Sequence, residues 1–155
     1  VKPEARLSVA LVPELTSMSA VEGAADTVFE RLEGSAGARR TLIIVSSDFT
    51  HYGGGFRFTP FGGDPLERVE AKVGEADRRV AGLAADLQLD RLFRHFSQEK
   101  STICGRYPIL LATRLFQKLG YRGRLVKYYN SNSFGEKRSE FVCYASILFG
   151  PEEST

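Results

Sequence analysis

Histidine and cysteine are scarce in this sequence. It holds two histidines and two cysteines among 155 residues, whereas a metal site usually takes three or four ligands. One histidine and one cysteine therefore leave a metal site underdetermined. Cys104 and Cys143 could form one disulfide, but without secretory signals we expect both thiols to be reduced.

Long apolar runs are also missing. None approaches the roughly 20 residues that span a bilayer, and the first residues lack the charged, apolar and small order of a signal peptide. We therefore expect a cytoplasmic protein without membrane contact. The net charge is +2 with dispersed Lys and Arg, which argues against a nucleic-acid partner. The chain starts at Val1 rather than Met, which suggests processing or a piece of a longer protein.

The first half of the sequence predicts a βαβ unit. Residues 7–12 (LSVALV) and 42–45 (LIIV) are short apolar runs, typical of strands buried on both faces. Between them, apolar residues from Val21 to Leu32 recur on one helical face. A strand, a helix and a strand in this order imply parallel strands with a right-handed crossover.

The rest of the chain continues this α/β pattern. Helical apolar stripes indicate helices at 66–87, 92–96 and 109–119. Strand-like apolar runs indicate strands at 125–129 and 141–149. The sequence therefore predicts a three-layer α/β/α domain with a mixed, mostly parallel sheet. We expect one domain over residues 1–150 and a tail over residues 151–155.

A polar loop follows the apolar run 42–45. It contains Ser47, Asp48, His51 and Tyr52, and ligands of open α/β sheets bind at the carboxyl ends of strands. His51 could serve as a general acid or base or as a metal ligand, and Asp48 could orient it. A structural turn with a stacked histidine explains the same pattern equally well.

A glycine-rich stretch comes next, at 53–64 (GGGFRFTPFGGD). Its glycines are typical of a phosphate cradle, but the Gly-Lys-Ser/Thr of a P-loop is missing. We interpret the stretch as a flexible lid or active-site loop.

Cys104 carries the second concentration of reactive chemistry. It lies in the segment STICGRYP (101–108), just before a predicted helix, and a helix amino terminus favours the thiolate form of cysteine. Arg106 could clamp an anionic group. A buried structural cysteine is slightly favoured for Cys104 on pattern alone, and a Cys-His protease lacks an oxyanion-hole signature. We predict that this segment meets the loop of His51. Cys143 and His95 are interpreted as a buried apolar residue and a surface histidine.

Two motifs in this order, SSDFTHYG (46–53) and STICGRYP (101–108), resemble the Memo family. The pattern extends to Tyr128-Tyr129-Asn130-Ser131 and to the closing Tyr144-Ala145 strand. Memo proteins are similar in fold to the class III extradiol dioxygenase (LigB-like) superfamily. The resemblance implies that this chain corresponds to the carboxyl-terminal half of a Memo protein. The family is associated with a radical-SAM protein and an AMMECR1-like protein, in the AmmeMemoRadiSam system.

The resemblance implies roles for particular residues. Cys104 matches the cysteine metal ligand of the family, and His51 matches the acid/base histidine beside the metal. Asp48 is placed with His51 in catalysis. The positions expected to line the substrate pocket are Ser47, Tyr52, Arg106 and Tyr129. Tyr107 stands where many members have His, and His95 matches neither of the family's two other histidine ligands.

Two functions remain open at this point. One is a metal-dependent, dioxygenase-like oxidoreductase whose non-haem iron or copper is held partly by Cys104. Its other ligands would come from a missing amino-terminal half or a second chain, in a homo- or hetero-oligomer. The other is a non-catalytic module that binds phosphopeptides or proteins, with Arg106, the glycine-rich loop and aromatic residues lining the groove.

Overall fold

The structure, a computed structural model, describes residues 7–34 and 41–151. The helices are α1 (Met18–Gly34), α2 (Leu66–Ala85), α3 (Leu89–Gln98) and α4 (Arg106–Lys118). The strands are β1 (His51–Tyr52), β2 (Tyr121–Asn130) and β3 (Phe141–Pro151), and a 3-10 turn, η2 (Ser131–Phe134), follows β2. The fold is α/β, as the sequence predicts.

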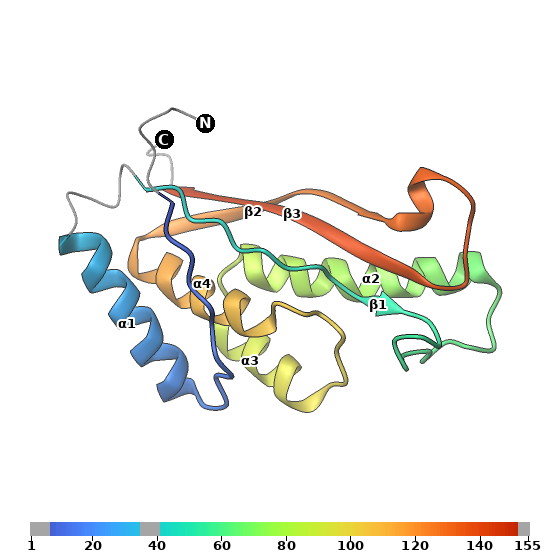
Figure 1. Cartoon of the computed structure of the whole chain (residues 1–155), viewed down its shortest axis with the longest axis horizontal. Helices are drawn as coiled ribbons and strands as arrows, with labels where there is room; N and C mark the ends of the chain where they lie inside the picture. Colours follow the sequence, from blue (N-terminus) through green and yellow to red (C-terminus); the bar gives the residue numbers. More distant parts are fainter. Residues whose placement is uncertain (1–6, 35–40, 152–155) are drawn as a thin grey trace.

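The sheet is antiparallel, so the predicted mostly parallel sheet is wrong. Its three strands lie in the order β1-β3-β2, with Tyr129 opposite Tyr144 and His51 opposite Val142. The stretch 131–140 joins β2 to β3 as a hairpin (Figure 1). A connection this short can only return the chain antiparallel, because a parallel crossover needs a dozen or more residues.

The two predicted amino-terminal strands are also wrong. Residues 7–12 and 41–46 have no strand assignment, and Leu11, Leu42 and Ile44 are 78–94% exposed. A strand buried on both faces needs neighbours and a covering layer. Among the described residues, neither segment has a backbone hydrogen bond to a strand.

The helices lie on one side of the sheet (Figure 1). Val69, Val73 and Val80 of α2 are buried in the main core with Phe141 and Cys143 of β3, which confirms the apolar stripe predicted for 66–87 and the buried position of Cys143. On the other face of the sheet Val126 and Leu148 are more than half exposed. The described residues therefore form one helical side and one sheet, without the second helical layer that the sequence predicts.

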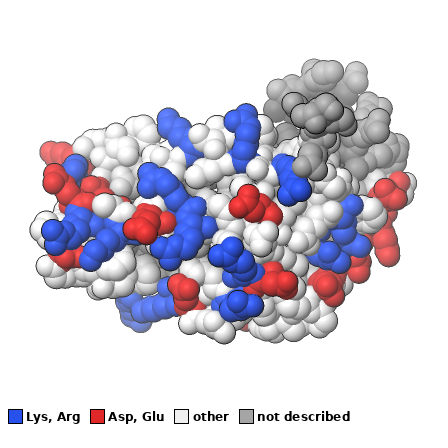
Figure 2. Space-filling view, turned by 180° about the vertical axis from the view of Figure 1, so that it is seen from behind, with Lys and Arg blue, Asp and Glu red and all other residues white. Residues whose placement is uncertain are grey.

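Charge is spread rather than concentrated. Figure 2 shows Lys and Arg mixed with Asp and Glu over the face seen from behind, with no extended area of one sign in that view. Among the described helices, none is long and apolar enough to cross a membrane. The division into a domain at 1–150 and a tail at 151–155 stays a prediction.

Candidate functional site

The two polar segments singled out in the sequence meet in the structure. The hydroxyl of Thr102 accepts a hydrogen bond from the His51 backbone N–H (2.9 Å) and donates one to the His51 carbonyl (2.9 Å). The Gly105 N–H donates to Ser47 Oγ at 2.9 Å. Backbone and hydroxyl groups therefore clamp the loop before β1 against the segment that leads into α4.

This close approach depends on the glycine before α4. A Cβ built on Gly105 would collide with the side chain of Ser47 and lie 3.2 Å from the Ser46 carbonyl. Any larger residue would push the two segments apart, because neither neighbour is the free end of a flexible side chain. Gly105 thus sets how near Cys104 comes to Asp48.

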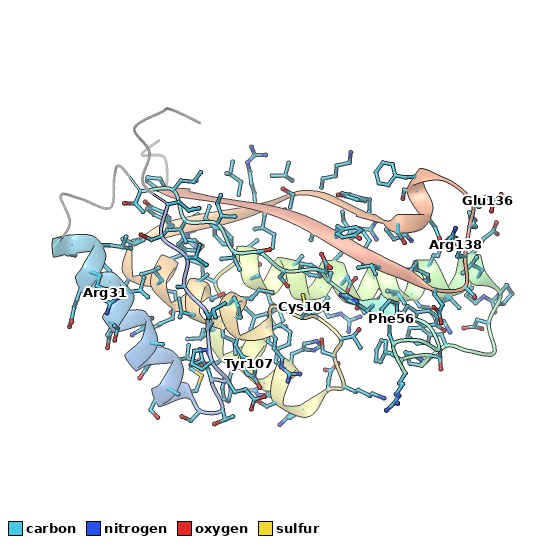
Figure 3. All side chains as sticks on the ribbon, in the orientation of Figure 1. Arg31, Phe56, Cys104, Tyr107, Glu136 and Arg138 are labelled. Carbon is cyan, nitrogen blue, oxygen red and sulfur yellow. The ribbon has the colours of Figure 1, made fainter. Side chains whose placement is uncertain are left out.

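Three donor atoms of different chemistry gather at this junction. One ligand atom each from Asp48, His51 and Cys104 lie within 4.8 Å of one another. The Asp48 carboxylate is 3.6 Å from His51 Nε2. The Asp48 backbone N–H donates to Cys104 Sγ at 3.2 Å, and the Ser47 hydroxyl lies 3.9 Å from the same sulfur. The group is partly open, because Cys104 is exposed. Figure 3 labels Cys104 in the segment that leads into α4.

The imidazole of His51 packs against an aromatic ring, but one of its nitrogens lacks a hydrogen bond. Its Nε2 is buried and has no hydrogen-bond partner. Phe56, from the turn after β1, packs edge-on against the ring at a centroid distance of 5.0 Å. A buried polar atom without a partner is costly unless something outside the structure binds it. This nitrogen faces the Asp48 carboxylate, whose Oδ2 lies 3.6 Å away.

The glycine-rich stretch forms an ordered turn beside the site. Gly53 and Phe58 exchange backbone hydrogen bonds of 2.9 and 3.2 Å, and the Gly55 N–H donates to Glu140 Oε1 at 2.6 Å. Gly53 has a φ of +136°, which favours glycine. The turn places Phe56 over His51, so the stretch covers one side of the site, as an active-site loop would.

A buried carboxylate anchors the loop from behind. Asp77 of α2 is 1% exposed and accepts hydrogen bonds from the hydroxyls of Thr50 (2.6 Å) and Tyr128 (2.9 Å). Burial raises the pKa of Asp77 above its ordinary value of 3.8, although the bonds from Thr50 and Tyr128 act in the opposite direction. Asp77 thereby fixes Thr50, one of the two residues between Asp48 and His51.

Not all of the residues predicted to line the substrate pocket lie beside Asp48, His51 and Cys104. Ser47 lies at the donor group, as described above. Tyr52 does not, because its side chain is 4% exposed and stacks on Phe141 in the core. The Arg106 guanidinium lies 4.9 Å from the centre of the Tyr107 ring.

An aromatic pair on β2 and β3 extends the site. Tyr129 packs against Tyr144 at 5.2 Å. Burial raises the pKa of Tyr144, and the negative charge of the Asp48 carboxylate raises it further. The sequence does not assign Tyr144 to the site. Its position opposite Tyr129 on an adjacent strand would have been the signal, but the register was not predictable.

The fold and the site define an α/β protein whose nitrogen, oxygen and sulfur donors meet where two loops join. Comparison with known proteins agrees with the motif resemblance. The family model described as "Memo-like protein" matches residues 5–148. The chain belongs to the Memo-like family.

Individual relatives give the same result at moderate identity. A MEMO1 family protein of Pyrococcus horikoshii is 31% identical over 113 residues, covering 71% of this chain and 38% of the relative. A MEMO1 family protein of Methanosarcina mazei is 30% identical, over 74% of this chain and 38% of the relative. The memo-1 homolog of Caenorhabditis elegans is 27% identical, over 71% and 33%.

The chain is much shorter than the relatives that it matches. This chain spans little more than a third of the relatives that it matches. The narrower expectation, that the resemblance is confined to the carboxyl-terminal half of the family, is not borne out by these matches.

Proposed function

We propose that Cys104, His51 and Asp48 hold a non-haem iron or copper ion and that the protein works as a metal-dependent oxidoreductase. The main support is His51, whose buried Nε2 has no hydrogen-bond partner and lies 3.6 Å from a carboxylate oxygen of Asp48. A metal ion would satisfy this nitrogen and neutralise the neighbouring carboxylate at the same time.

The donor set fits such an ion. Thiolate and imidazole are ligands that copper and iron accept, and a carboxylate is common at non-haem iron. Two ligands bonded at about 2.0–2.3 Å lie at most about 4.6 Å apart. The 4.8 Å spread of the three donors is close to this limit, so small side-chain movements suffice. Three protein ligands would leave a coordination position for substrate, as catalytic sites do.

A bound iron or copper ion would supply one-electron chemistry and Lewis acidity at this place. The surrounding residues have separate tasks. Phe56 shields one edge of His51 from water, and Ser47 holds the segment of Cys104. Tyr144 has a pKa raised above its ordinary value of 10, so its phenol stays protonated at neutral pH and acts as a hydrogen-bond donor rather than as an acid.

A further polypeptide would complete the pocket. The donor group is open on the side of Cys104, and Leu11, Leu42 and Ile44 leave apolar side chains uncovered. We infer that a second chain or a further segment covers this surface, with radical-SAM and AMMECR1-like proteins as candidates among cellular neighbours. Apolar area of this kind gains about 25 cal/mol per Å² when it is removed from water.

Metal analysis under exclusion of oxygen tests the proposal. Wild type, Cys104→Ala and His51→Ala are purified alone and after co-expression with genomic neighbours, and iron and copper are measured per chain. We expect about one ion per wild-type chain and at least a tenfold loss in both variants, because each removes a direct ligand. Cys143→Ala is the matched control and should retain the ion. Metal retained by Cys104→Ala, or no metal in any sample, would show the proposal to be wrong.

A second candidate function is a non-catalytic phosphopeptide- or protein-binding module. Its support is the aromatic cluster on the outer face of the sheet, where Tyr129 packs against Tyr144 and Phe134 at 5.2 Å each. The Lys127 ammonium lies 5.7 Å from the Tyr129 ring. Salt-sensitive peptide binding that survives Cys104→Ala would favour this function over the metal site.

A further inference from the structure

A cavity lies behind the loop that carries Asp48 and His51. Its volume is about 600 Å³, and it is bounded by the turn after β1, by α2, by the end of α3 and by the segment 100–103. Thr50 and His51 are neighbours in an extended stretch, so their side chains point to opposite faces. His51 faces Asp48, whereas Thr50 faces Asp77 and this cavity.

The inner wall of the cavity is apolar. Val73 and Val80 of α2 and Ile103 are 2–3% exposed, and Phe58 and Phe61 of the turn close the side nearest β1. The one carboxyl group in this wall, Asp77, is already engaged by the hydroxyls of Thr50 and Tyr128. An apolar body of small size can therefore be buried there, as in most ligand sites of 300–1,000 Å³.

The mouth of the cavity is cationic. Arg57 and Lys100 both line it and are exposed, and the Lys100 ammonium donates to the Arg57 carbonyl at 3.0 Å. Within the described ranges neither has an ion-pair partner. Glu99 is the one carboxylate at the rim, and its Oε1 lies 3.2 Å from His95 Nδ1. The interpretation of His95 as a surface histidine did not include this contact. The mouth therefore carries the two positive charges of Arg57 and Lys100 against the single negative charge of Glu99, beside an apolar interior.

The backbone at the mouth is strained. Arg57 has a φ of +53°, the left-handed region that a residue with a side chain rarely adopts. Its N–H donates to the Gly54 carbonyl at 3.0 Å, which closes the turn. Non-glycine residues held in this region concentrate at binding sites. The strain keeps the Arg57 side chain beside the entrance.

We propose that this cavity binds a small amphipathic carboxylate. Its apolar body lies against Val73, Val80 and Ile103, and its carboxylate lies between Arg57 and Lys100. The cavity and the donor group are separated by one layer of backbone. Binding here is independent of the metal at Cys104 and does not rest on the proposed redox function.

Calorimetry with a charged probe and its neutral counterpart tests this directly. 1-Naphthoate and 1-naphthalenemethanol share an aromatic body and differ in charge. We expect the complete chain to bind one naphthoate and to bind the alcohol more weakly. Lys100→Gln and Arg57→Gln should each weaken naphthoate binding about two- to fivefold, the range of a partly exposed charge pair, and leave the alcohol unchanged. Arg124→Gln, on the outer face of the sheet, is the matched control and should change neither.

A third variant tests the position of the apolar body. Ala76 lines the cavity and is exposed on α2, so Ala76→Leu narrows the space without strain in the core and should weaken both probes. Cys104→Ala should bind naphthoate as the wild type does, even if it loses its metal. Equal affinity for the two probes, no effect of the two charge variants, or loss of naphthoate binding in Cys104→Ala would each overturn the proposal.

Discussion

At the scale of single residues, the site depends on an absent side chain and on a sulfur atom. Gly105 lets the segment before α4 touch Ser47, and Cys104, directly before it, receives the Asp48 N–H at 3.2 Å. The sequence indicates a contact between the two segments, because both combine reactive side chains with a predicted strand or helix boundary. Nothing in the sequence indicated that Tyr52 would be in the core and Tyr144 near Asp48.

Replacing Gly105 tests the close approach. Gly105→Ala should lower the free energy of unfolding by about 1–3 kcal/mol, the usual cost of inserting a methyl group into filled space. Urea unfolding measures this loss. Gly82→Ala, inside α2 with nothing within 4 Å of the added methyl, is the control and should stabilise by about 0.5–1 kcal/mol. Equal effects of the two substitutions would contradict the collision with Ser47.

The two thiols should react very differently. Cys104 is exposed, whereas Cys143 is fully buried and burial raises its pKa to about 12. Because the thiolate is the nucleophile, iodoacetamide at pH 7 should modify Cys104 alone in the native protein. Mass spectrometry should detect the second adduct only after denaturation. Two adducts on the native chain would show that the core around Cys143 opens.

At the scale of elements, Asp77 joins three parts of the fold. It lies on α2 and takes hydrogen bonds from Thr50, before β1, and from Tyr128 on β2. Helical periodicity predicted α2 well, because apolar residues every three or four positions need only local sequence. The two strands of the β2–β3 hairpin were also predicted, at 125–129 and 141–149, because they lie close together in the sequence. The position of β1 beside β3 was not predictable, because these two strands are far apart in the sequence.

The pH dependence of stability should report on Asp77. Its pKa is raised in the folded chain, so between 3.8 and the folded value the native state holds more protons than the unfolded state. The contribution of this group to stability therefore falls as the pH rises. Compared with Asp77→Asn, the wild type should lose free energy of unfolding from pH 4 upward.

Urea unfolding at several pH values measures this difference. Asp86→Asn, at the exposed end of α2, is the control and should follow the wild type. The free energy of unfolding of the wild type minus that of Asp77→Asn should decrease as the pH rises. A value that stays constant or increases with pH would contradict the raised pKa.

At the scale of the whole molecule, the described residues leave much apolar surface uncovered. Leu7, Val9, Leu11, Leu42 and Ile44 are all more than three-quarters exposed. The apolar runs at 7–12 and 42–45 predict buried strands by composition alone. That prediction is wrong for the described residues, which provide no neighbouring strand to cover these side chains.

Association should follow from this surface. We expect sedimentation of the isolated chain to show larger species as concentration rises. Leu42→Lys combined with Ile44→Lys should weaken the association at least about tenfold, because each apolar side chain gains about 1.5–3 kcal/mol when buried. Ser97→Lys with Gln98→Lys adds the same charge on α3 and should have little effect. A wild-type monomer at all concentrations would contradict this prediction.

The distance along the chain between the donors has a consequence for how the protein is made. Asp48 and Cys104 are 56 residues apart, and α2 and α3 lie between them. On the ribosome, Asp48 and His51 emerge well before Cys104, so the newly made chain carries an acid and an imidazole but no sulfur ligand. A contact across so long a loop carries a larger closure entropy than the local contacts within α2 and α3, so we expect those helices to form before Asp48 and Cys104 meet. An ion held by all three donors, as proposed above, would therefore be bound only after Cys104 has been made and the two segments have met.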